Sequence, residues 1–378
     1  MSDVYTLYGS YASYYTAKVR SDLRKKGIPF VERLPSDPMF RNRVRPASGS
    51  HRIPQLLTPQ GEVVQDSVAI VDHLERRFPE LPAFPGSPRQ RTFVHLMELL
   101  ASEGLVRLAW LHRWLFEENQ RFVKMDFGRS FKPQGSDDEL WKYGSLIAER
   151  MMSYGLPEST EALRQALDEK YLELLGLFEA HLIEHPYFLG GHPSAADYAI
   201  MGALHAHLGR DPAGLRMMQN HAPRTFRWVE HMIVPEVQSP EFFSRPVEYL
   251  ADDAVPETAL GILAFIAREY GEPFVLGALA FNQAMARVDA KAGYELSPDQ
   301  DQPILAEERV TVDGVEQATR ANLHAVWLSQ RARGWFQSRP AEARSGIEAM
   351  LGPGVASNLL NVPLTHTIER VNNRLVIA

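Results

Sequence analysis

The chain has 378 residues, of which 45% are hydrophobic and 23% charged, and its formal net charge is -7. This length and composition predict two or three folded domains, and without a long basic run a nucleic-acid partner is not expected. Cysteine is absent, which excludes disulfides, thiolate metal sites and a cysteine nucleophile.

The first eighty residues alternate between strand and helix signals. β-Branched and aromatic runs predict strands, and apolar residues at helical spacing predict helices. The order β-α-β followed by ββα is that of a thioredoxin-like α/β domain. The predicted elements are a strand at 4–8, a loop at 9–13, a helix at 16–26, a strand at 28–32 and a hairpin of 53–57 with 63–64.

Two neighbouring motifs predict a site for a peptide-like ligand. Pro54 opens an apolar run, where a cis X-Pro bond can present the backbone N–H and C=O of Ile53 to an extended ligand. Asp66 and Ser67 precede apolar residues spaced as one face of a helix. The free N–H groups and the dipole of a helix start favour a carboxylate.

Together, the segments Ile53-Pro54-Gln55-Leu56 and Gln65-Asp66-Ser67-Val68-Ala69-Ile70 resemble the glutathione-binding half of the cytosolic glutathione transferases. The resemblance implies that the backbone before Pro54 binds the cysteinyl part of glutathione. It also implies that Asp66 and Ser67 hold the γ-glutamyl group. Arg52 is a candidate for the glycyl carboxylate, although an exposed arginine is as often only solvated. The plain alternative for Asp66 and Ser67 is a simple helix cap.

Transferase chemistry needs a glutathione thiolate, and a hydrogen-bond donor aimed at the sulfur lowers the pKa of a thiol. Aligning Lys18-Val19-Arg20 with the similar Arg-Val-Arg of the zeta-like classes places Ser13 on their catalytic serine. In the tyrosine classes the donor register falls on Gly9. Two alternatives stay open. In the first, Ser13 is only a helix cap. In the second, the donor is one of the loop tyrosines, Tyr11, Tyr14 or Tyr15.

A linker rich in proline and glycine at 78–89 marks the first domain boundary. Beyond it, apolar spacing predicts helices at 92–117 and 159–184, and the polar segment 124–139 is expected to be a loop. Trp110 and Trp114 lie where the family builds its acceptor site, but aromatic residues at helical spacing are more often core.

Ser194 and Asp197 form a variant capping box at a helix start. It resembles the buried box of the family's helical domain, and its expected role is structural. His205 and His207 lack an acidic partner at ligand spacing, so no metal site is expected.

The last third of the chain exceeds the family's usual length. Helices are predicted at 256–270, 273–290 and 319–335, and Asp313-Gly314 predicts a hairpin turn. Residues 368–377 alternate around Asn372-Asn373 and predict a second hairpin or an added strand. The extension could pack over the acceptor site, cover a dimer surface or bind a partner.

The resulting prediction is a thioredoxin-like glutathione-binding domain at 1–82, an all-α glutathione transferase C-terminal domain at 89–250 and a mostly helical extension at 251–378. The protein is expected to bind glutathione as cosubstrate and to activate its thiolate against a small hydrophobic electrophile, by conjugation, isomerisation or ether cleavage. A homodimer is expected. Without a signal peptide or a long apolar run, the expected location is the cytoplasm. The alternative is a non-catalytic scaffold that uses the extension to bind proteins.

Overall fold

The computed structural model describes residues 4–288, 290–296 and 304–378. Residues 1–3, 289 and 297–303, which belong to the predicted segments 1–82 and 251–378, lie outside this description. The chain forms two compact units: unit 1 comprises Met1–Ala83 and Val106–Glu248, and unit 2 comprises Phe84–Leu105 and Tyr249–Ala378. The predicted boundaries at 82, 89 and 250 stay predictions.

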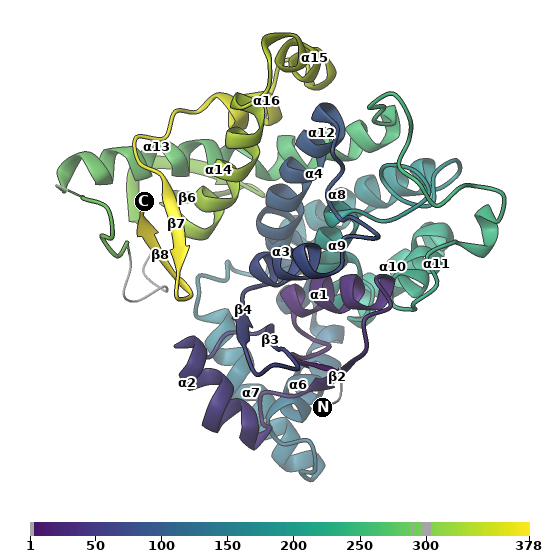
Figure 1. The fold of residues 1–378 in the computed structure, drawn as a ribbon. Helices are drawn as coiled ribbons and strands as arrows, with labels where there is room; N and C mark the ends of the chain where they lie inside the picture. Colours follow the sequence, from purple (N-terminus) through teal and green to yellow (C-terminus); the bar gives the residue numbers. More distant parts are fainter. Residues whose placement is uncertain (1–3, 289, 297–303) are drawn as a thin grey trace. The chain divides into compact units, whose positions relative to one another are not determined.

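The first part of unit 1 is the predicted thioredoxin-like domain. Its four strands lie in the order β2-β1-β3-β4 (Figure 1). The β1–β2 pair is parallel, and the β1–β3 and β3–β4 pairs are antiparallel. The elements are β1 (Tyr5–Tyr8), α1 (Tyr14–Lys25), β2 (Phe30–Arg33), η1 (Phe40–Val44), α2 (Arg45–Ser48), β3 (Gln55–Leu57), β4 (Val63–Gln65) and α3 (Ser67–Arg77).

Alternation along β1 divides its side chains between two cores. Leu7 packs with Val19 of α1 and Ile70 of α3 in one fully buried cluster. Tyr8 points to the opposite face, as successive strand residues do, and packs against Phe40. Both faces of the central strand are therefore covered.

The rest of unit 1 is helical. A π-helical segment η3 (Gly202–His207) continues α9 and packs beside α1. The elements are α5 (Leu105–Leu115), whose first residue belongs to unit 2, α6 (Glu117–Phe131), α7 (Asp137–Met152), α8 (Glu161–His181), α9 (Ala195–Met201), η3, α10 (Pro212–His221), α11 (Pro223–Met232) and the short η4 (Pro240–Phe242).

The prediction of a loop at 124–139 is wrong. Only the residues between Phe131 and Asp137 connect two helices, α6 and α7, which pack directly on each other. Gly128 and Gly144 permit this contact, because a Cβ at Gly144 would lie 1.8 Å from the carbonyl oxygen of Lys124. Gly128 lies in the segment that was predicted to be a loop, and in the structure it allows two helix backbones to approach each other.

Unit 2 is built around α4 (Pro88–Leu99), which packs against α12, α14 and α15 (Figure 1). The predicted helix 92–117 is thus divided into α4, the π-helical η2 (Leu100–Gly104) and α5. The other elements of unit 2 are α12 (Glu257–Tyr270), α13 (Glu272–Arg287), β5 (Ile304–Val312), β6 (Val315–Ala321), α14 (Leu323–Gln337), α15 (Ala341–Leu351), α16 (Val355–Asn361), β7 (Ile368–Val371) and β8 (Arg374–Ile377).

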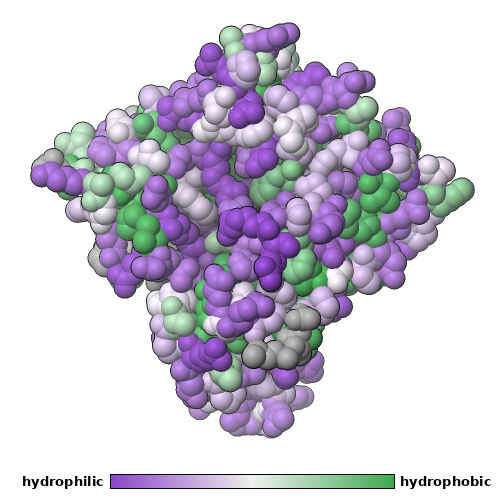
Figure 2. Space-filling model, viewed as in Figure 1, coloured by the Kyte–Doolittle hydropathy of each residue, from purple (hydrophilic) through white to green (hydrophobic). Residues whose placement is uncertain are grey.

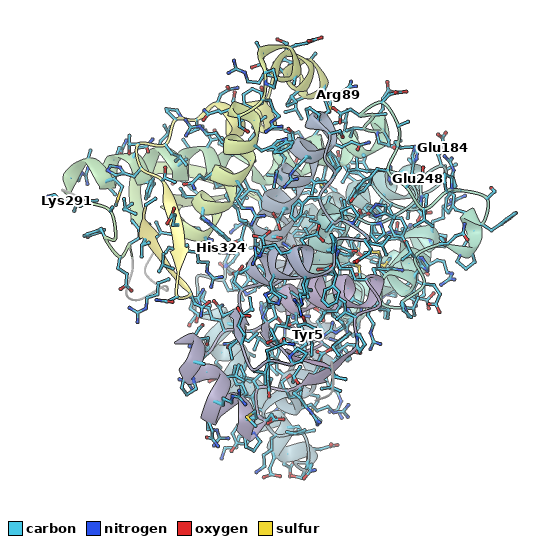
Figure 3. All side chains as sticks on the ribbon, in the orientation of Figure 1. Tyr5, Arg89, Glu184, Glu248, Lys291 and His324 are labelled. Carbon is cyan, nitrogen blue, oxygen red and sulfur yellow. The ribbon has the colours of Figure 1, made fainter. Side chains whose placement is uncertain are left out.

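The hairpin predicted at Asp313-Gly314 is confirmed as β5–β6, and of the two alternatives for residues 368–377 the structure has the hairpin, β7–β8. The extension also caps α4. The carboxylate of Asp253 accepts hydrogen bonds from the backbone N–H groups of Arg89 (labelled in Figure 3; 2.8 Å) and Gln90 (2.9 Å). A helix start leaves such N–H groups without partners inside the helix, so Asp253, which is distant in the sequence, provides the hydrogen-bond acceptor for the first N–H groups of α4.

Within the described part of the chain, no helix has the length and apolar character needed to cross a membrane. The face in Figure 2 is a mixture of hydrophilic side chains and scattered hydrophobic ones.

Candidate functional site

Strand register brings the three predicted binding segments to one edge of the sheet. Tyr8, the last residue of β1, pairs with Gln55, the first of β3, and Gln55 pairs with Gln65, the last of β4. The loop after β1, the Ile53-Pro54 bond and the Asp66-Ser67 pair therefore follow or precede neighbouring strand ends. Neighbouring strands lie about 5 Å apart, so the segments fit around one ligand of tripeptide size.

The Ile53-Pro54 peptide bond is cis, as predicted. Ile53 is half-buried against the cluster that contains Tyr8 and Phe40. The buried amide of Gln55 donates to the carbonyl oxygens of Ser50 and Arg52, both at 2.8 Å, and so fixes the approach to Ile53. Arg52 itself is exposed.

Asp66 begins α3 with an unusual backbone. Its φ is 84° and its ψ is 137°, and its Oδ1 accepts from the N–H of Val68 (2.8 Å) and Ala69 (3.4 Å). Ser67, the first helical residue, is only 2% exposed. The plain role of Asp66 as a helix cap is thus confirmed, and glutathione binding by Asp66 and Ser67 stays a prediction.

Ser13 is likewise a helix cap. Its Oγ accepts from the N–H of Thr16 at 3.3 Å, and its own N–H donates to the carbonyl oxygen of Ser10 at 3.1 Å. Accepting a hydrogen bond leaves the hydroxyl proton of Ser13 able to donate to another group. At Gly9, where the tyrosine classes have their donor, even a Cβ would lie 2.2 Å from Thr16.

The loop tyrosines have different surroundings. Tyr14 is buried and meets the ring of His207 edge-on, with ring centres 5.4 Å apart. Tyr11 is 47% exposed. Among the tyrosines proposed as alternative donors, Tyr11 therefore has the better access to a ligand.

Three arginines that the sequence did not identify as site residues contact the loop before Ser13. The guanidinium of Arg20 donates to the carbonyl oxygen of Ser10 (3.2 Å) and lies 4.0 Å from the centre of the Tyr11 ring. Arg113 donates to the carbonyl oxygen of Ala12 (2.9 Å). Arg210 lies 5.6 Å from the centre of the Tyr11 ring.

Each of these arginines also has a carboxylate partner. The closest N···O distances are 2.7 Å for Arg20 with Glu32, 2.7 Å for Arg113 with Asp211 and 2.9 Å for Arg210 with Asp126. Burial raises the pKa of Asp211 above its usual range, and the charge of Arg113 opposes this shift. The loop is thus surrounded by neutralised pairs, and only Arg20 had a sequence signal, in the Lys18-Val19-Arg20 motif.

The histidines beside the loop are uncharged at neutral pH. Burial, with the nearby charges of Arg20 and Arg210, lowers the pKa of His205 to about 3. Burial and the charge of Arg113 lower the pKa of His207 well below its usual range. Neither imidazole therefore changes its charge over the pH range in which a bound thiol ionises.

The tryptophans of α5 are part of the core. Trp114 is 5% exposed and packs in a cluster with Val123 and Ala148, with Trp110 at its margin. His112 is fully buried, stacks on Phe116 and contacts the carboxylate of Asp168 at 3.1 Å. The interpretation that these aromatic residues belong to the core is confirmed for Trp114.

The predicted capping box at α9 is confirmed. Oδ2 of Asp197 accepts from the N–H (2.8 Å) and the hydroxyl (2.9 Å) of Ser194, and Oδ1 accepts from the N–H of Phe188 (3.0 Å). Burial raises the pKa of Asp197 to about 6, against the opposing effect of these hydrogen bonds. These bonds start α9.

A groove of about 1260 Å³ lies between the end of α5 and the starts of α6 and α8. Most of its charged lining residues are acidic, and none of the predicted site residues lines it. It is separate from the sheet edge described above.

Comparison with known proteins agrees with this architecture. The family model "Glutathione S-transferase, N-terminal domain" matches residues 7–83, and "Glutathione S-transferase, C-terminal domain" matches residues 144–234. No protein with a curated function is matched by the sequence.

Solved structures similar to this chain include a glutathione S-transferase from Methylobacterium radiotolerans in complex with glutathione sulfonate (20% identity, 67% of this chain and 100% of that chain, TM-score 0.34). The β-etherase LigF from Sphingobium sp. is similar at 19% identity, over 60% of this chain and 94% of that chain, with a TM-score of 0.42. Gtt2 from Saccharomyces cerevisiae is similar at 18% identity, over 63% of this chain and 99% of that chain, with a TM-score of 0.34.

The two family matches fall on the thioredoxin-like domain and on the helices that follow it, and the sheet edge has the cis proline and helix start of the predicted binding half. Residues 7–83 and 144–234 therefore match the N-terminal and C-terminal domains of glutathione S-transferases.

Proposed function

We propose that this protein is a glutathione transferase that binds glutathione at the sheet edge and uses Ser13 to stabilise its thiolate. The observation that supports this most is the pairing of Tyr8 with Gln55 and of Gln55 with Gln65, which gathers the three segments at one edge. In this proposal the backbone of Ile53 pairs with the cysteinyl part of glutathione. The start of α3, at Asp66 and Ser67, holds the γ-glutamyl group, and Arg52 binds the glycyl carboxylate.

Activation of the sulfur needs one donor and no protein thiol. The hydroxyl of Ser13 donates to the sulfur, which stabilises the thiolate and raises its population at neutral pH. The thiolate then attacks an electrophilic carbon of the second substrate, and the leaving group departs with the electron pair. Because the chain has no cysteine, it does not form a mixed disulfide of its own.

The second substrate is proposed to be a small hydrophobic electrophile with an aromatic part. Exposed aromatic side chains gather beside the loop: Arg210 lies between Tyr11 and Phe122, 5.6 and 5.4 Å from their ring centres. Tyr11 and Phe122 are 47% and 37% exposed. Such rings offer an apolar surface that stacks on an aromatic acceptor.

Calorimetric titration with glutathione tests the proposal, with thiolate absorbance measured on the same samples. Asp66→Ala is expected to lose binding. Ser13→Ala is expected to bind glutathione but to fail to raise thiolate absorbance. Tyr11→Phe is the matched control, because it removes a hydroxyl from the same loop and keeps the ring that contacts Arg20. A loss of thiolate signal in Tyr11→Phe but not in Ser13→Ala would make Tyr11 the donor. No binding by the parent protein would contradict the transferase function and favour a scaffold.

We also propose that the protein acts as a homodimer in the cytoplasm, as the resemblance to the cytosolic transferases implies. Sedimentation equilibrium of the full chain tests the assembly. A single species with the mass of one chain, 42.7 kDa, at all concentrations would contradict it.

A further inference from the structure

We propose that Arg113 is a positioning residue for Ser13: it fixes the loop Ser10–Ser13 from the helical part of unit 1 and thereby sets the pKa of bound glutathione. This inference depends on the proposed function, because it assigns to Arg113 an effect exerted through Ser13. Arg113 lies 100 residues beyond Ser13 in the sequence, and neither family resemblance nor spacing drew attention to it.

The loop Ser10–Ser13 is a tight turn held from within. The N–H of Ser13 donates to the carbonyl oxygen of Ser10 (3.1 Å), and the N–H of Ala12 donates to the hydroxyl of Ser10 (3.3 Å). The hydroxyl of Ser10 is also 2.7 Å from that of Ser130. Because the turn has these bonds, the orientation of each peptide plane constrains the next.

Arg113 fixes the peptide plane next to Ser13. Its Nη1 donates to the carbonyl oxygen of Ala12 at 2.9 Å, and that carbonyl belongs to the peptide bond whose N–H is that of Ser13. Rotation of this plane would move the Ser13 N–H away from Ser10 and would tilt the Cα–Cβ bond of Ser13. The hydroxyl that is proposed to face the sulfur therefore depends on the bond from Arg113.

The guanidinium itself has little freedom. Nε and Nη2 bind the two oxygens of Asp211 at 2.7 and 3.0 Å, and Nη2 also donates to the carbonyl oxygen of Ala206 at 2.6 Å. The side chains of Arg113 and Asp211 are each 2% exposed. A bidentate buried pair has a fixed geometry, and a lysine cannot reproduce the fork that reaches three acceptors.

Each arginine beside the loop has a carboxylate partner, and the two histidines beside it are uncharged at neutral pH. Arg20 is paired with Glu32, Arg210 with Asp126 and Arg113 with Asp211. His205 and His207 are buried and uncharged, as described above. The ionisation of the bound thiol is therefore expected to follow a single transition whose midpoint reports the donor geometry.

The test is the pH dependence of thiolate absorbance in the glutathione complex of the full-length protein. Arg113→Lys keeps the charge beside Asp211 but removes the fork, so the turn loses its bond to Ala12. The midpoint is expected to rise by about one pH unit, the effect of one weakened hydrogen bond to the charged form. Glutathione affinity is expected to stay within about threefold of the parent value, since its binding segments are untouched.

A second variant keeps the test informative if Arg113→Lys does not fold. Arg113→Met combined with Asp211→Leu removes both buried charges together, which is tolerated far better than removal of one. It is expected to show the same rise in the midpoint. Leu167→Ala in α8 is the control for general loosening, because Leu167 is fully buried and its truncation leaves the loop bonds intact. Its midpoint is expected to equal that of the parent.

Each outcome separates this inference from the proposed function. If Ser13→Ala raises the midpoint and both Arg113 variants leave it unchanged, the positioning role is wrong and the function of Ser13 stands. If the Arg113 variants raise the midpoint but Ser13→Ala does not, Arg113 does not act through Ser13 and the inference is overturned. An equal shift in Leu167→Ala would also overturn it, because general loosening would then explain the effect.

Discussion

Oδ1 of Asp66 accepts a hydrogen bond from the N–H of Val68 at 2.8 Å, while the backbone of Asp66 has a φ of 84°. Positive φ is unfavourable for any residue with a Cβ. Asp66 therefore stabilises α3 through its carboxylate and destabilises the fold through its backbone. Substitutions at this position can separate binding from stability.

Asp66→Gly removes the strain and the cap together, so these effects are expected to cancel to within about 1 kcal/mol in the free energy of unfolding. Asp66→Ala removes the cap and keeps the strain, and we expect a loss of about 1 to 2 kcal/mol. Both variants are expected to lose glutathione binding, because both lack the carboxylate. Urea unfolding and calorimetry measure the two properties. Binding by the glycine variant at parental affinity would remove Asp66 from the site.

The buried capping box of α9 should contribute more stability than the exposed box of α7. Asp197 accepts three hydrogen bonds in a fully buried site. Asp197→Ala leaves these donors unpaired, and we expect a loss of about 3 kcal/mol or more. The measurement is the free energy of unfolding in urea.

The box of Ser136 and Glu139 provides the control. Glu139 accepts from the Ser136 N–H at 2.9 Å, which is the bond that Asp197 accepts from Ser194, but it lacks the other two bonds of Asp197 and its side chain is 47% exposed. Glu139→Ala is expected to cost less than about 1 kcal/mol. Equal losses in the two variants would show that burial does not determine how much a capping box contributes to the free energy of unfolding.

Asp22 is expected to weaken the fold as the pH rises. Both of its carboxylate oxygens are buried without a hydrogen-bond partner in the described part of the chain, and burial raises its pKa to about 7. Between about pH 4 and pH 7 the unfolded chain releases this proton while the folded chain keeps it, so stability falls over that range and the loss is complete above it. Asp22→Asn removes this loss.

We therefore expect Asp22→Asn to match the parent protein near pH 4 and to exceed its stability by a few kcal/mol at pH 8. Thermal unfolding of both proteins at a series of pH values measures the difference. A constant difference across the series would mean that Asp22 has the same pKa in the folded and the unfolded chain.

The contact between α6 and α7 should not tolerate a methyl group. A Cβ at Gly144 would lie 1.8 Å from a backbone oxygen, which cannot move as a flexible side chain can. Gly144→Ala is expected to cost at least about 2 kcal/mol through separation of the helices. Gly176→Ala in α8 is the matched control, because no atom lies within 4 Å of its Cβ and the site is exposed. It is expected to gain up to about 1 kcal/mol. Similar effects of the two changes in urea unfolding would contradict this explanation.

The sequence was most informative where structure depends on neighbours along the chain. The cis bond before Pro54, the caps at Ser13 and Asp66 and the turn at Asp313-Gly314 follow from local residue chemistry. Residues 372 and 373 have positive φ in the second hairpin, as expected for a turn of two asparagines. These elements were predicted within a few residues of their bounds.

Prediction failed where a residue acts on a distant segment. The segment 124–139, which contains Gly128, was predicted to be a loop, whereas Gly128 and Gly144 admit another helix, which a single segment does not reveal. The bond from Arg113 to Ala12 joins residues 101 positions apart, and its partner Asp211 lies another 98 positions along the chain. No periodicity encodes such a contact, so the support of the loop became visible only in the fold.

The orientation of Ser13 can be tested without a second substrate. The natural chain has no cysteine, so Ser13→Cys introduces a single thiol. If this side chain faces the sulfur of bound glutathione, its thiolate attacks oxidised glutathione, forms a mixed disulfide and releases one glutathione thiolate. Mass spectrometry of the intact protein should show one added glutathionyl group.

Ser10→Cys is the matched control, three residues away in the same loop. Ser10 is 4% exposed and its hydroxyl is turned toward Ser130, so its cysteine is expected to remain unmodified over the same time. The parent protein should show no adduct. Modification of Ser10→Cys but not of Ser13→Cys would mean that Ser13 points away from the bound sulfur. Its hydroxyl would then serve α1 alone, through the N–H of Thr16, and the thiolate would need another donor.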